Sequence, residues 1–372
     1  MTKPEGVPYL DLSKEFNVLK DEWFAMISED GAHGSWILGP NVHAFEKEVA
    51  EFIGCRYAIG VANGTDALYL SLRALGIGPG DEVITTPYTF FATSEVIDMV
   101  GARPVFVDIE VDSFNIDPLL VEQAVTEKTR AIIPVHLFGN PADMTAINAI
   151  AEKYDLAVVE DAAQAFGAQH DGQRVGSMGH TGCFSFYPTK VLGCYGDGGL
   201  LTTDSDEIAE AVRKLRNHGA AAAFQHDEIG MNSRLDEVQA ALLRLKLKKL
   251  DENIASRQRI AGMYDKRLAK LGIICPIRPE HGSHAFNLYT IRSTKVDTIR
   301  QALMENAIGN STCYPVPLAL QEVYQHLKYS ADNFPVSVAL GNEVVSLPVF
   351  PDMTELQVDR VCHVIEVAIS IN

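Results

Sequence analysis

The sequence lacks several features that would identify a membrane, secreted or nucleic-acid-binding protein. Of its 372 residues only 31 are Lys or Arg, against 49 Asp or Glu, so the net charge is −18. A surface this acidic repels phosphate backbones and anionic lipids, and we expect no nucleic-acid partner. No apolar run is long enough to cross a bilayer, and the first residues, MTKPEGVP, lack the basic and apolar regions of a secretion signal.

Motifs for metals, disulfides and common nucleotides are also missing. The six cysteines show no Cys-x-x-Cys spacing and the eleven histidines no His-Glu-x-x-His spacing, so we predict neither a disulfide framework nor a metal site. A G-x-G-x-x-G run after a first strand is absent, as is Gly-Lys-Ser/Thr, which argues against dinucleotide and P-loop folds. We expect reduced thiols and a cytoplasmic location.

Short β-rich apolar runs alternate with amphipathic stretches between residues 56 and 161. The predicted strands are 57–61, 82–85, 105–108, 131–135 and 156–159, and the predicted helices are 66–75, 94–100, 118–125 and 144–154. Alternation of this kind predicts an α/β fold with a doubly wound, mostly parallel sheet. Ligands of such folds bind beyond the carboxyl ends of the strands, so the search for a site begins there.

The order of helical and strand patterns changes in the last third of the chain. A long helical pattern covers 234–250, and from 251 onward helix, strand (286–291) and helix follow one another. We therefore predict a large α/β domain over residues 1–250 and a smaller C-terminal α+β domain over 251–372.

A possible phosphate site lies at Asn63-Gly64-Thr65, where the first strand ends and a helix begins. Free backbone N–H groups, the helix dipole and the Thr65 hydroxyl would attract a phosphate there. The alternative is an ordinary helix start, capped by Asn63 or Thr65.

Two further motifs place reactive side chains after strands. Asp161 ends the run Val158-Val159-Glu160-Asp161, where its carboxylate could bind a protonated ring nitrogen, a metal or a cation, or could simply cap a helix. Lys190 lies between an aromatic run and the glycine-rich turn Gly196-Asp197-Gly198-Gly199. Most lysines are solvated surface charges, but this setting favours a partly desolvated amine with a lowered pKa, as Schiff-base chemistry requires.

Two remaining candidates are polar or aromatic residues in loops. Asn232 and Arg234 could offer an amide and a guanidinium to a phosphate or carboxylate, although Ser233 with Asp236 and Glu237 could equally form a capped helix start. Phe90 follows a predicted strand and could stack on a planar cofactor, although core packing is the more common role of such a residue.

Taken together, these motifs resemble the DegT/StrS-type nucleotide-sugar aminotransferases, which are pyridoxal phosphate enzymes of fold type I. The resemblance extends over nearly the whole chain, from Pro8-Tyr9-Leu10-Asp11-Leu12 to Tyr314-Pro315-Val316-Pro317-Leu318. It implies that Lys190 forms the Schiff base and moves the proton, and that Asp161 pairs with the pyridine nitrogen. It further implies ring contacts from Gln164 and Phe90, and phosphate contacts from Gly64, Thr65, Ser185 and the neighbouring subunit's copy of Asn232.

The resemblance also implies a reaction and its partners. L-Glutamate would convert the cofactor to pyridoxamine phosphate, whose amine then passes to a keto sugar carried on dTDP or UDP, in a homodimer with shared active sites. Arg234 and Tyr314 would contact the substrate. The loop after Lys190 is similar to members that aminate C3, in pathways such as O-antigen synthesis. The alternatives are transfer to a C4 ketone or a free cyclitol ketone, and a non-catalytic regulator that binds the cofactor or sugar.

Two departures from the family pattern bear on the substrate. Where many relatives have His-Tyr-Pro, this chain has Cys313-Tyr314-Pro315, which removes a hydrogen bond that a histidine could make to the sugar. The segment Ala220 to His226 lacks the basic and tyrosyl residues common there, which suggests a different grip on the diphosphate. A sugar dehydratase of the same fold is disfavoured, because those members have histidine in place of the Schiff-base lysine.

Overall fold

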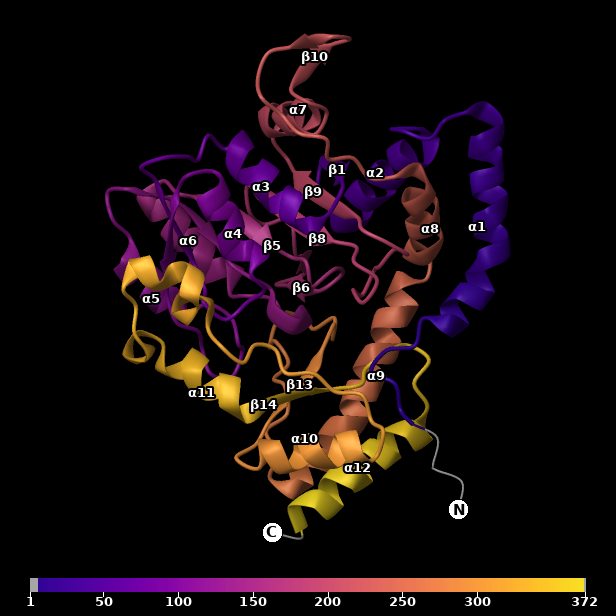
Figure 1. Cartoon of the computed structure of the whole chain (residues 1–372), viewed down its shortest axis with the longest axis vertical. Coiled ribbons are helices and arrows are strands. Elements are labelled where there is room, and N and C mark those ends of the chain that lie inside the picture. The colour runs from indigo at the N-terminus through magenta and orange to yellow at the C-terminus, as the bar shows by residue number, and fades with distance from the viewer. Residues whose placement is uncertain (1–5, 371–372) are drawn as a thin grey trace.

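A seven-stranded sheet forms the centre of the computed structural model, which describes residues 6–370 (Figure 1). The strand order is β1-β9-β8-β5-β4-β2-β3. The four pairs from β3 across to β8 are parallel, whereas β9 runs antiparallel to both β8 and β1. The predicted mostly parallel α/β sheet is therefore confirmed. Its strands are β1 (Tyr57–Val61), β2 (Glu82–Thr85), β3 (Arg103–Phe106), β4 (Thr129–Ile133), β5 (Ala157–Asp161), β8 (Thr181–Ser185) and β9 (Gly199–Thr203).

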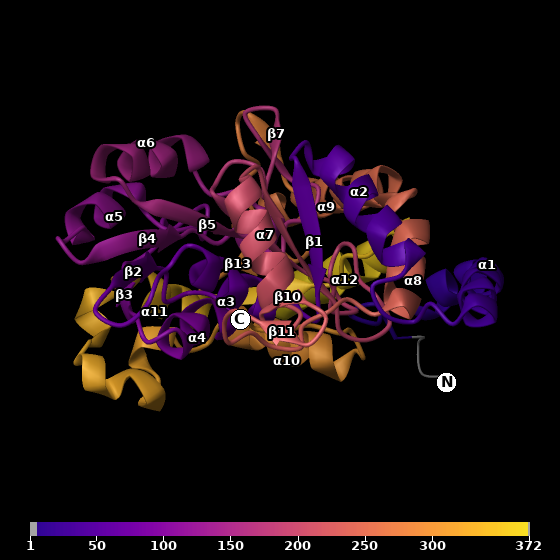
Figure 2. The same ribbon diagram turned by 90° about the horizontal axis from the view of Figure 1, so that it is seen from above.

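Helices cover both faces of this sheet because successive strand residues point to opposite sides. Val83 and Val159 pack on one face, whereas their neighbours Ile84 and Val158 pack on the other. The first face carries α3 (Gly64–Ala74), α4 (Ala92–Met99) and α7 (Asp206–Leu215), and the second carries α2 (Pro40–Ile53), α5 (Pro118–Ala124) and α6 (Met144–Tyr154) (Figure 2). Because helices cover both faces of the sheet, apolar residues occupy consecutive positions along its strands.

Long helices flank the sheet on the side of β1. They are α1 (Ser13–His33), α8 (Glu237–Leu247) and α9 (Leu250–Leu268). Trp23 of α1 donates its indole N–H to the carbonyl of Val238 at 2.9 Å, which fixes α1 against α8. The buried Glu237 carboxylate accepts hydrogen bonds from the backbone N–H groups of Gly39 and Val42, so α8 also holds the start of α2.

The C-terminal part has its own core. The antiparallel pair β13 (Tyr289–Arg292) and β14 (Val344–Leu347) packs with α9, α10 (Val296–Glu305) and α12 (Glu355–Ser370), and Val7 joins the same cluster. α11 (Pro335–Glu343) leads into β14. The remaining short elements are β6 (Gln169–His170), β7 (Gln173–Arg174), β10 (Ala220–Ala222), β11 (Gln225–His226), β12 (Gly282–Ser283) and the 3-10 turns Leu137–Gly139, Ala269–Leu271, Leu318–Leu320, Glu322–Leu327 and Ala331–Asn333.

The structure differs locally from the predicted elements. The expected helix over 234–250 is wrong as one unit, because Lys249 leaves helical geometry (φ −108°, ψ 6°) and separates α8 from α9. β13 begins at Tyr289 and not at Phe286, whose positive φ of 49° is incompatible with a strand. The division into domains at residue 250 stays a prediction.

Three properties apply to all the residues that the structure describes, 6–370. None of its helices is both long and apolar enough to span a membrane. The six cysteines are all free thiols. No group of three or more His, Cys, Asp or Glu side chains is arranged to hold a metal ion within these residues.

Candidate active site

Lys190 lies in the loop that joins β8 to β9. The base of this loop is closed by hydrogen bonds from Phe186 N to Gly198 O and from Cys194 N to Phe186 O, both 2.8 Å. Gly193 packs tightly inside it, since a Cβ at this position would lie 2.8 Å from the carbonyl oxygens of Tyr187 and Pro188. The glycines that the sequence places after Lys190 therefore allow a compact loop that fixes the lysine.

The Lys190 side chain lines a cavity of about 220 Å³ between the large sheet and the C-terminal part. Burial lowers the pKa of its amine below that of an ordinary lysine, and the nearby charge of Asp161 only partly opposes this shift. An amine with a lowered pKa is more often uncharged and able to act as a nucleophile or base. The other lining residues are Tyr9, Leu10, Gln164, Thr189, Arg257, Asn287, Leu288, Ser311, Cys313, Tyr314, Leu347 and Val349.

Asp161 ends β5 and is buried, with its carboxylate held by two donors. Thr93 of α4 donates its hydroxyl to Oδ2 at 2.8 Å, and Ala163 donates its backbone N–H to Oδ1 at 3.2 Å. Burial raises the pKa of Asp161, whereas the Thr93 and Ala163 hydrogen bonds and the charge of Lys190 lower it. The hydroxyl of Thr89 lies 3.0 Å from that of Thr93 and must donate to it, because Thr93 has already given its proton to Asp161.

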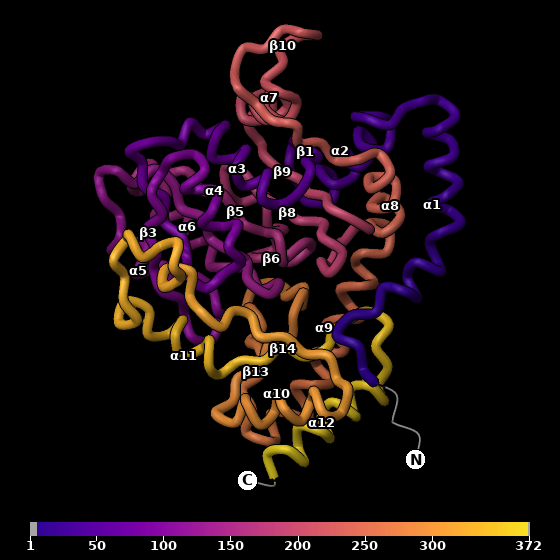
Figure 3. The backbone as a smooth tube through the Cα atoms, viewed as in Figure 1, coloured from indigo at the N-terminus to yellow at the C-terminus, as the bar shows by residue number. Residues whose placement is uncertain are grey.

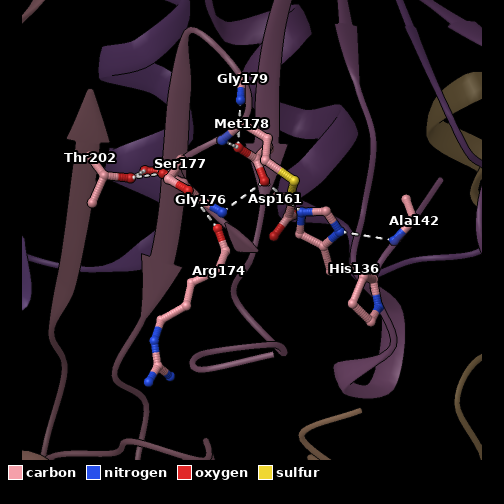
Figure 4. A network of polar contacts seen from close by, with 12 residues as sticks. His136, Ala142, Asp161, Arg174, Gly176, Ser177, Met178, Gly179 and Thr202 are labelled. Atoms are coloured by element: carbon pink, nitrogen blue, oxygen red, sulfur yellow. Dashed lines mark hydrogen bonds and ion pairs between the residues drawn. The ribbon is translucent and has the colours of Figure 1, made fainter. Parts of the chain in front are cut away.

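The preceding residue, Glu160, anchors this end of the sheet. Its fully buried carboxylate accepts backbone N–H groups of Gly176, Met178 and Gly179 at 2.6 to 2.7 Å, and lies 3.0 Å from His136 Nε2. Figure 4 labels these three donors and His136. His136 Nδ1 accepts the N–H of Ala142, so the ring is neutral and Nε2 carries the proton. With its charge satisfied in this way, Glu160 fixes the strand end from which Asp161 projects.

Gln164 is held from two sides of the cavity. Its Oε1 accepts the backbone N–H of Phe138 and its Nε2 donates to the Tyr314 hydroxyl, both at 3.0 Å. One amide hydrogen of Gln164 and the hydroxyl proton of Tyr314 remain available to a ligand. Cys313 also lines the cavity, and burial raises the pKa of its thiol.

The β1–α3 turn meets the end of β8 in very close contact. A Cβ on Gly64 would lie 2.8 Å from Cβ of Ser185, so only glycine allows this approach. The turn therefore brings the amino end of α3, with the half-exposed Thr65, beside the Ser185 hydroxyl. Asn63 caps the helix through a 2.8 Å hydrogen bond from Asp66 N, which leaves Thr65 free of that capping role.

We expect Gly64→Ala to weaken cofactor binding about tenfold or more, because the added methyl group must displace Ser185, at a cost of about 1–3 kcal/mol. Equilibrium dialysis against pyridoxal phosphate measures the change. Gly78→Ala is the matched control, since the nearest atom to its Cβ would be 3.7 Å away. Equal affinity of the two variants would contradict a phosphate site at this turn.

The remaining predicted residues are only partly brought together. Phe90 is 60% exposed, which is high for so large an apolar side chain and suits stacking on a ligand. Arg234 donates to Asn217 Oδ1 at 2.9 Å. Asn232 is exposed and has no side-chain hydrogen bond to the cluster around Lys190 in residues 6–370, whereas Ser233 accepts the N–H of Ala62 and so does not cap α8.

The residues present fit pyridoxal phosphate. A buried carboxylate suits its protonated ring nitrogen, an exposed aromatic ring suits its planar face, and the tight turn with serine and threonine hydroxyls suits its phosphate. Lys190 supplies the amine with a lowered pKa. We therefore expect this group to be held by Asp161, Phe90, Gly64 and Lys190, with Thr65, Gln164 and Ser185.

Three residues of the site were not identified from the sequence. Thr89 lies in the bend after β2 and Thr93 in the first turn of α4, so the only sequence signal for this pair is two hydroxyl residues four positions apart after a strand. Arg257 occupies a position in the buried stripe of α9 otherwise formed by Ile254, Ile260, Ala261, Tyr264 and Leu268. An arginine on an apolar stripe is a departure from the helix pattern that indicates a special role.

Comparison with known proteins gives a family match and several relatives. A sequence model of the DegT/DnrJ/EryC1/StrS aminotransferase family matches residues 18–366. The chain is 46% identical to the "pleiotropic regulatory protein" of Geobacillus stearothermophilus, over 95% of both chains. It is 42% identical to UDP-2-acetamido-2-deoxy-3-oxo-D-glucuronate aminotransferase of Pseudomonas aeruginosa, over 96% of this chain and 98% of that one. It is also 42% identical to dTDP-3-amino-3,4,6-trideoxy-alpha-D-glucose transaminase of Streptomyces venezuelae, over 95% and 94%.

Two solved structures have a closely similar fold. DesV of S. venezuelae, crystallised with a ketimine intermediate, superimposes with a TM-score of 0.95 at 42% identity and 98% coverage of both chains. NtdA of Bacillus subtilis, with the bound cofactor PMP, superimposes with a TM-score of 0.92 at 30% identity, over 99% of this chain and 87% of that one.

Proposed function

Because the chain belongs to the DegT/DnrJ/EryC1/StrS aminotransferase family, a family of pyridoxal phosphate enzymes, we propose that it transfers the amino group of L-glutamate to C3 of a keto sugar linked to UDP or dTDP. The observation that carries the proposal is Lys190, with its lowered pKa, lining one cavity with Gln164 and Tyr314. The names of two relatives, which specify a 3-oxo or 3-amino sugar on UDP or dTDP, support position C3.

Four residues of the site have separate roles in the reaction. When bound, pyridoxal phosphate supplies an electron sink for negative charge on the substrate carbon. Asp161 keeps the ring nitrogen protonated, and Gln164 orients the ring through its free amide hydrogen. Lys190 moves the proton at the substrate carbon, since burial lowers the pKa of its amine and leaves more of it uncharged and able to accept a proton. Tyr314 offers its hydroxyl proton to the substrate while its oxygen holds Gln164.

We also propose a homodimer in which Asn232 and Arg234 complete the partner's site. The hairpin β10–β11 projects from the body of the chain (Figure 3), and the side chains of Phe224 and Ile229 in this arm are 99% and 84% exposed. Apolar side chains so exposed on an arm are typical of a contact between subunits. The free cysteines support a reducing compartment, and we place the enzyme in the cytoplasm.

The test is a product assay with five acceptors, each with L-glutamate: the 3-keto and 4-keto forms of a UDP sugar and of a dTDP sugar, and a free cyclitol ketone. Formation of 2-oxoglutarate and a 3-amino sugar is the expected result. Amination of only the 4-keto sugar, or of only a free cyclitol ketone, would contradict the C3 assignment.

A regulatory role is the second candidate, favoured by the name of the Geobacillus relative. The intact set of Lys190, Asp161 and Gln164 argues for turnover, because a protein that only senses a ligand does not need a proton-transferring lysine. Binding of a keto sugar without any release of 2-oxoglutarate would favour the regulator.

A further inference from the structure

Arg257 borders the active site without an assigned role. It lies on α9, is only 4% exposed, and lines both the 220 Å³ cavity and a neighbouring cavity of about 370 Å³. Lys190 lines the same two cavities. The guanidinium therefore borders the space in which a substrate must meet the lysine amine.

The charge of Arg257 is incompletely compensated. Both of its recorded hydrogen bonds come from Nη1, to the carbonyls of Phe286 (3.2 Å) and Val349 (2.7 Å), while Nε is buried without a partner. It forms no ion pair with a carboxylate of residues 6–370. The acid whose charge acts on it, Glu15, is instead paired with Lys246. Burial lowers the pKa of Arg257 to about 10, so the group is still cationic at neutral pH.

A buried charge without a counter-ion is costly, and a ligand of opposite charge removes that cost. Asn287, 7% exposed and also lining the smaller cavity, has its amide Oδ1 buried without a partner. Two under-satisfied polar side chains thus border the same space as Lys190. The phosphate group of the cofactor is expected at the Gly64–Ser185 contact and so does not account for them.

We infer that Arg257 is the binding site for a carboxylate of a small-molecule substrate, and that the free Oδ1 of Asn287 accepts a hydrogen bond from an N–H or O–H group of the same ligand. This inference rests on the proposed function and names a substrate subsite within it. Guanidinium groups match carboxylates in geometry and charge, which a lysine or an amide does less well. The carboxylate comes either from the amino donor, L-glutamate, or from an acceptor sugar with a carboxylate at C6.

The experiment compares Arg257→Met with Arg259→Met in the holoenzyme. Arg259 lies on the same helix but is exposed, and within residues 6–370 its side chain hydrogen-bonds only to Met263 Sδ, so its loss removes the same charge away from the cavity. Calorimetry measures binding of glutarate, a dicarboxylate with no amino group to transfer. Initial rates give kcat and KM for L-glutamate and for two acceptors that differ only in a carboxylate or a hydroxymethyl group at C6.

We expect Arg257→Met to weaken one carboxylate ligand about 30-fold or more and Arg259→Met to change neither. If the donor supplies the carboxylate, glutarate binding falls and KM for L-glutamate rises. If the sugar supplies it, only the uronate acceptor loses kcat/KM, while glutarate binding stays the same. Arg257→Lys, which retains the charge, should recover part of the loss in either case.

Three results would separate failure of this inference from other causes. Identical behaviour of Arg257→Met and Arg259→Met, in a wild type that aminates a keto sugar, would overturn the carboxylate site and leave the proposed function intact. Equal loss for all ligands, not relieved in Arg257→Lys and accompanied by a lower melting temperature, would assign Arg257 a structural role and also overturn it. A wild type that binds glutarate through Arg257 but aminates no keto sugar would instead contradict the proposed function.

Discussion

We expect Lys190→Ala to lower the turnover rate about 10⁴-fold or more, while the protein still folds. The side chain borders a cavity and makes no hydrogen bond or ion pair within residues 6–370, so its removal should cost little stability. The loss combines the covalent hold on the cofactor with proton transfer at the substrate carbon, which by itself contributes about 10²–10⁴-fold. Release of 2-oxoglutarate from L-glutamate measures the change.

Lys190→Arg is the control, because it retains the positive charge but offers no uncharged amine. Borohydride treatment followed by mass spectrometry should fix pyridoxal phosphate on the wild type and on neither variant. Circular dichroism of both variants should match the wild type. Normal turnover by Lys190→Ala would refute the transaminase assignment altogether.

Asp161→Asn is expected to lower kcat about 10²–10³-fold, because it removes the negative charge opposite the ring nitrogen while leaving the shape of the side chain almost unchanged. Thr93→Val should have a smaller effect, about 5- to 30-fold, since it removes only the 2.8 Å hydrogen bond that helps to keep Asp161 ionised. Initial rates with L-glutamate measure both variants.

The pH dependence of the rate distinguishes the role of Asp161 from that of Thr93. Burial raises the pKa of Asp161 and the Thr93 hydrogen bond lowers it, so loss of that bond should move the acid limb of the rate profile to higher pH. Below that pKa the carboxylate is protonated and activity falls. Asp161→Asn has no such group and should lose this limb. An unchanged acid limb in Thr93→Val would show that Thr93 does not act through Asp161.

Sequence patterns were sufficient to locate the strands that are buried between the two helix layers, but not always their ends. The runs at 57–61 and 82–85 match β1 and β2 residue for residue, whereas those at 105–108 and 131–135 begin two residues after β3 and β4 do. Asp161 was proposed for the site because it is an acid at the end of such a run. Gly64 was proposed because it lies where a strand ends and a helix begins, a pattern that an ordinary capped helix start shares.

Residues whose role depends on contacts far along the chain could not be predicted. The hydrogen bond between Gln164 and Tyr314 joins side chains 150 residues apart, and the residues around either position do not predict it. The break at Lys249 was missed because the sequence around it retains apolar residues at helical spacing, whereas α9 shares a core with α8 only through Leu250 and Ile254 and packs on a second core from Ile260 onward. Local pattern fixes where a strand or helix forms but not which partner a side chain meets.

The position of β9 has a consequence for how the chain reaches its folded state. β9 (199–203) is the only neighbour of β1 (57–61) in the sheet, so β1 has no strand to pair with until the whole of the intervening segment has been made and ordered. Pairings of such large sequence separation carry a high entropic cost of loop closure and slow the folding of a domain. The same strand also pairs with β8 and closes the loop of Lys190, so β1 joins the sheet only against the strand that ends this loop.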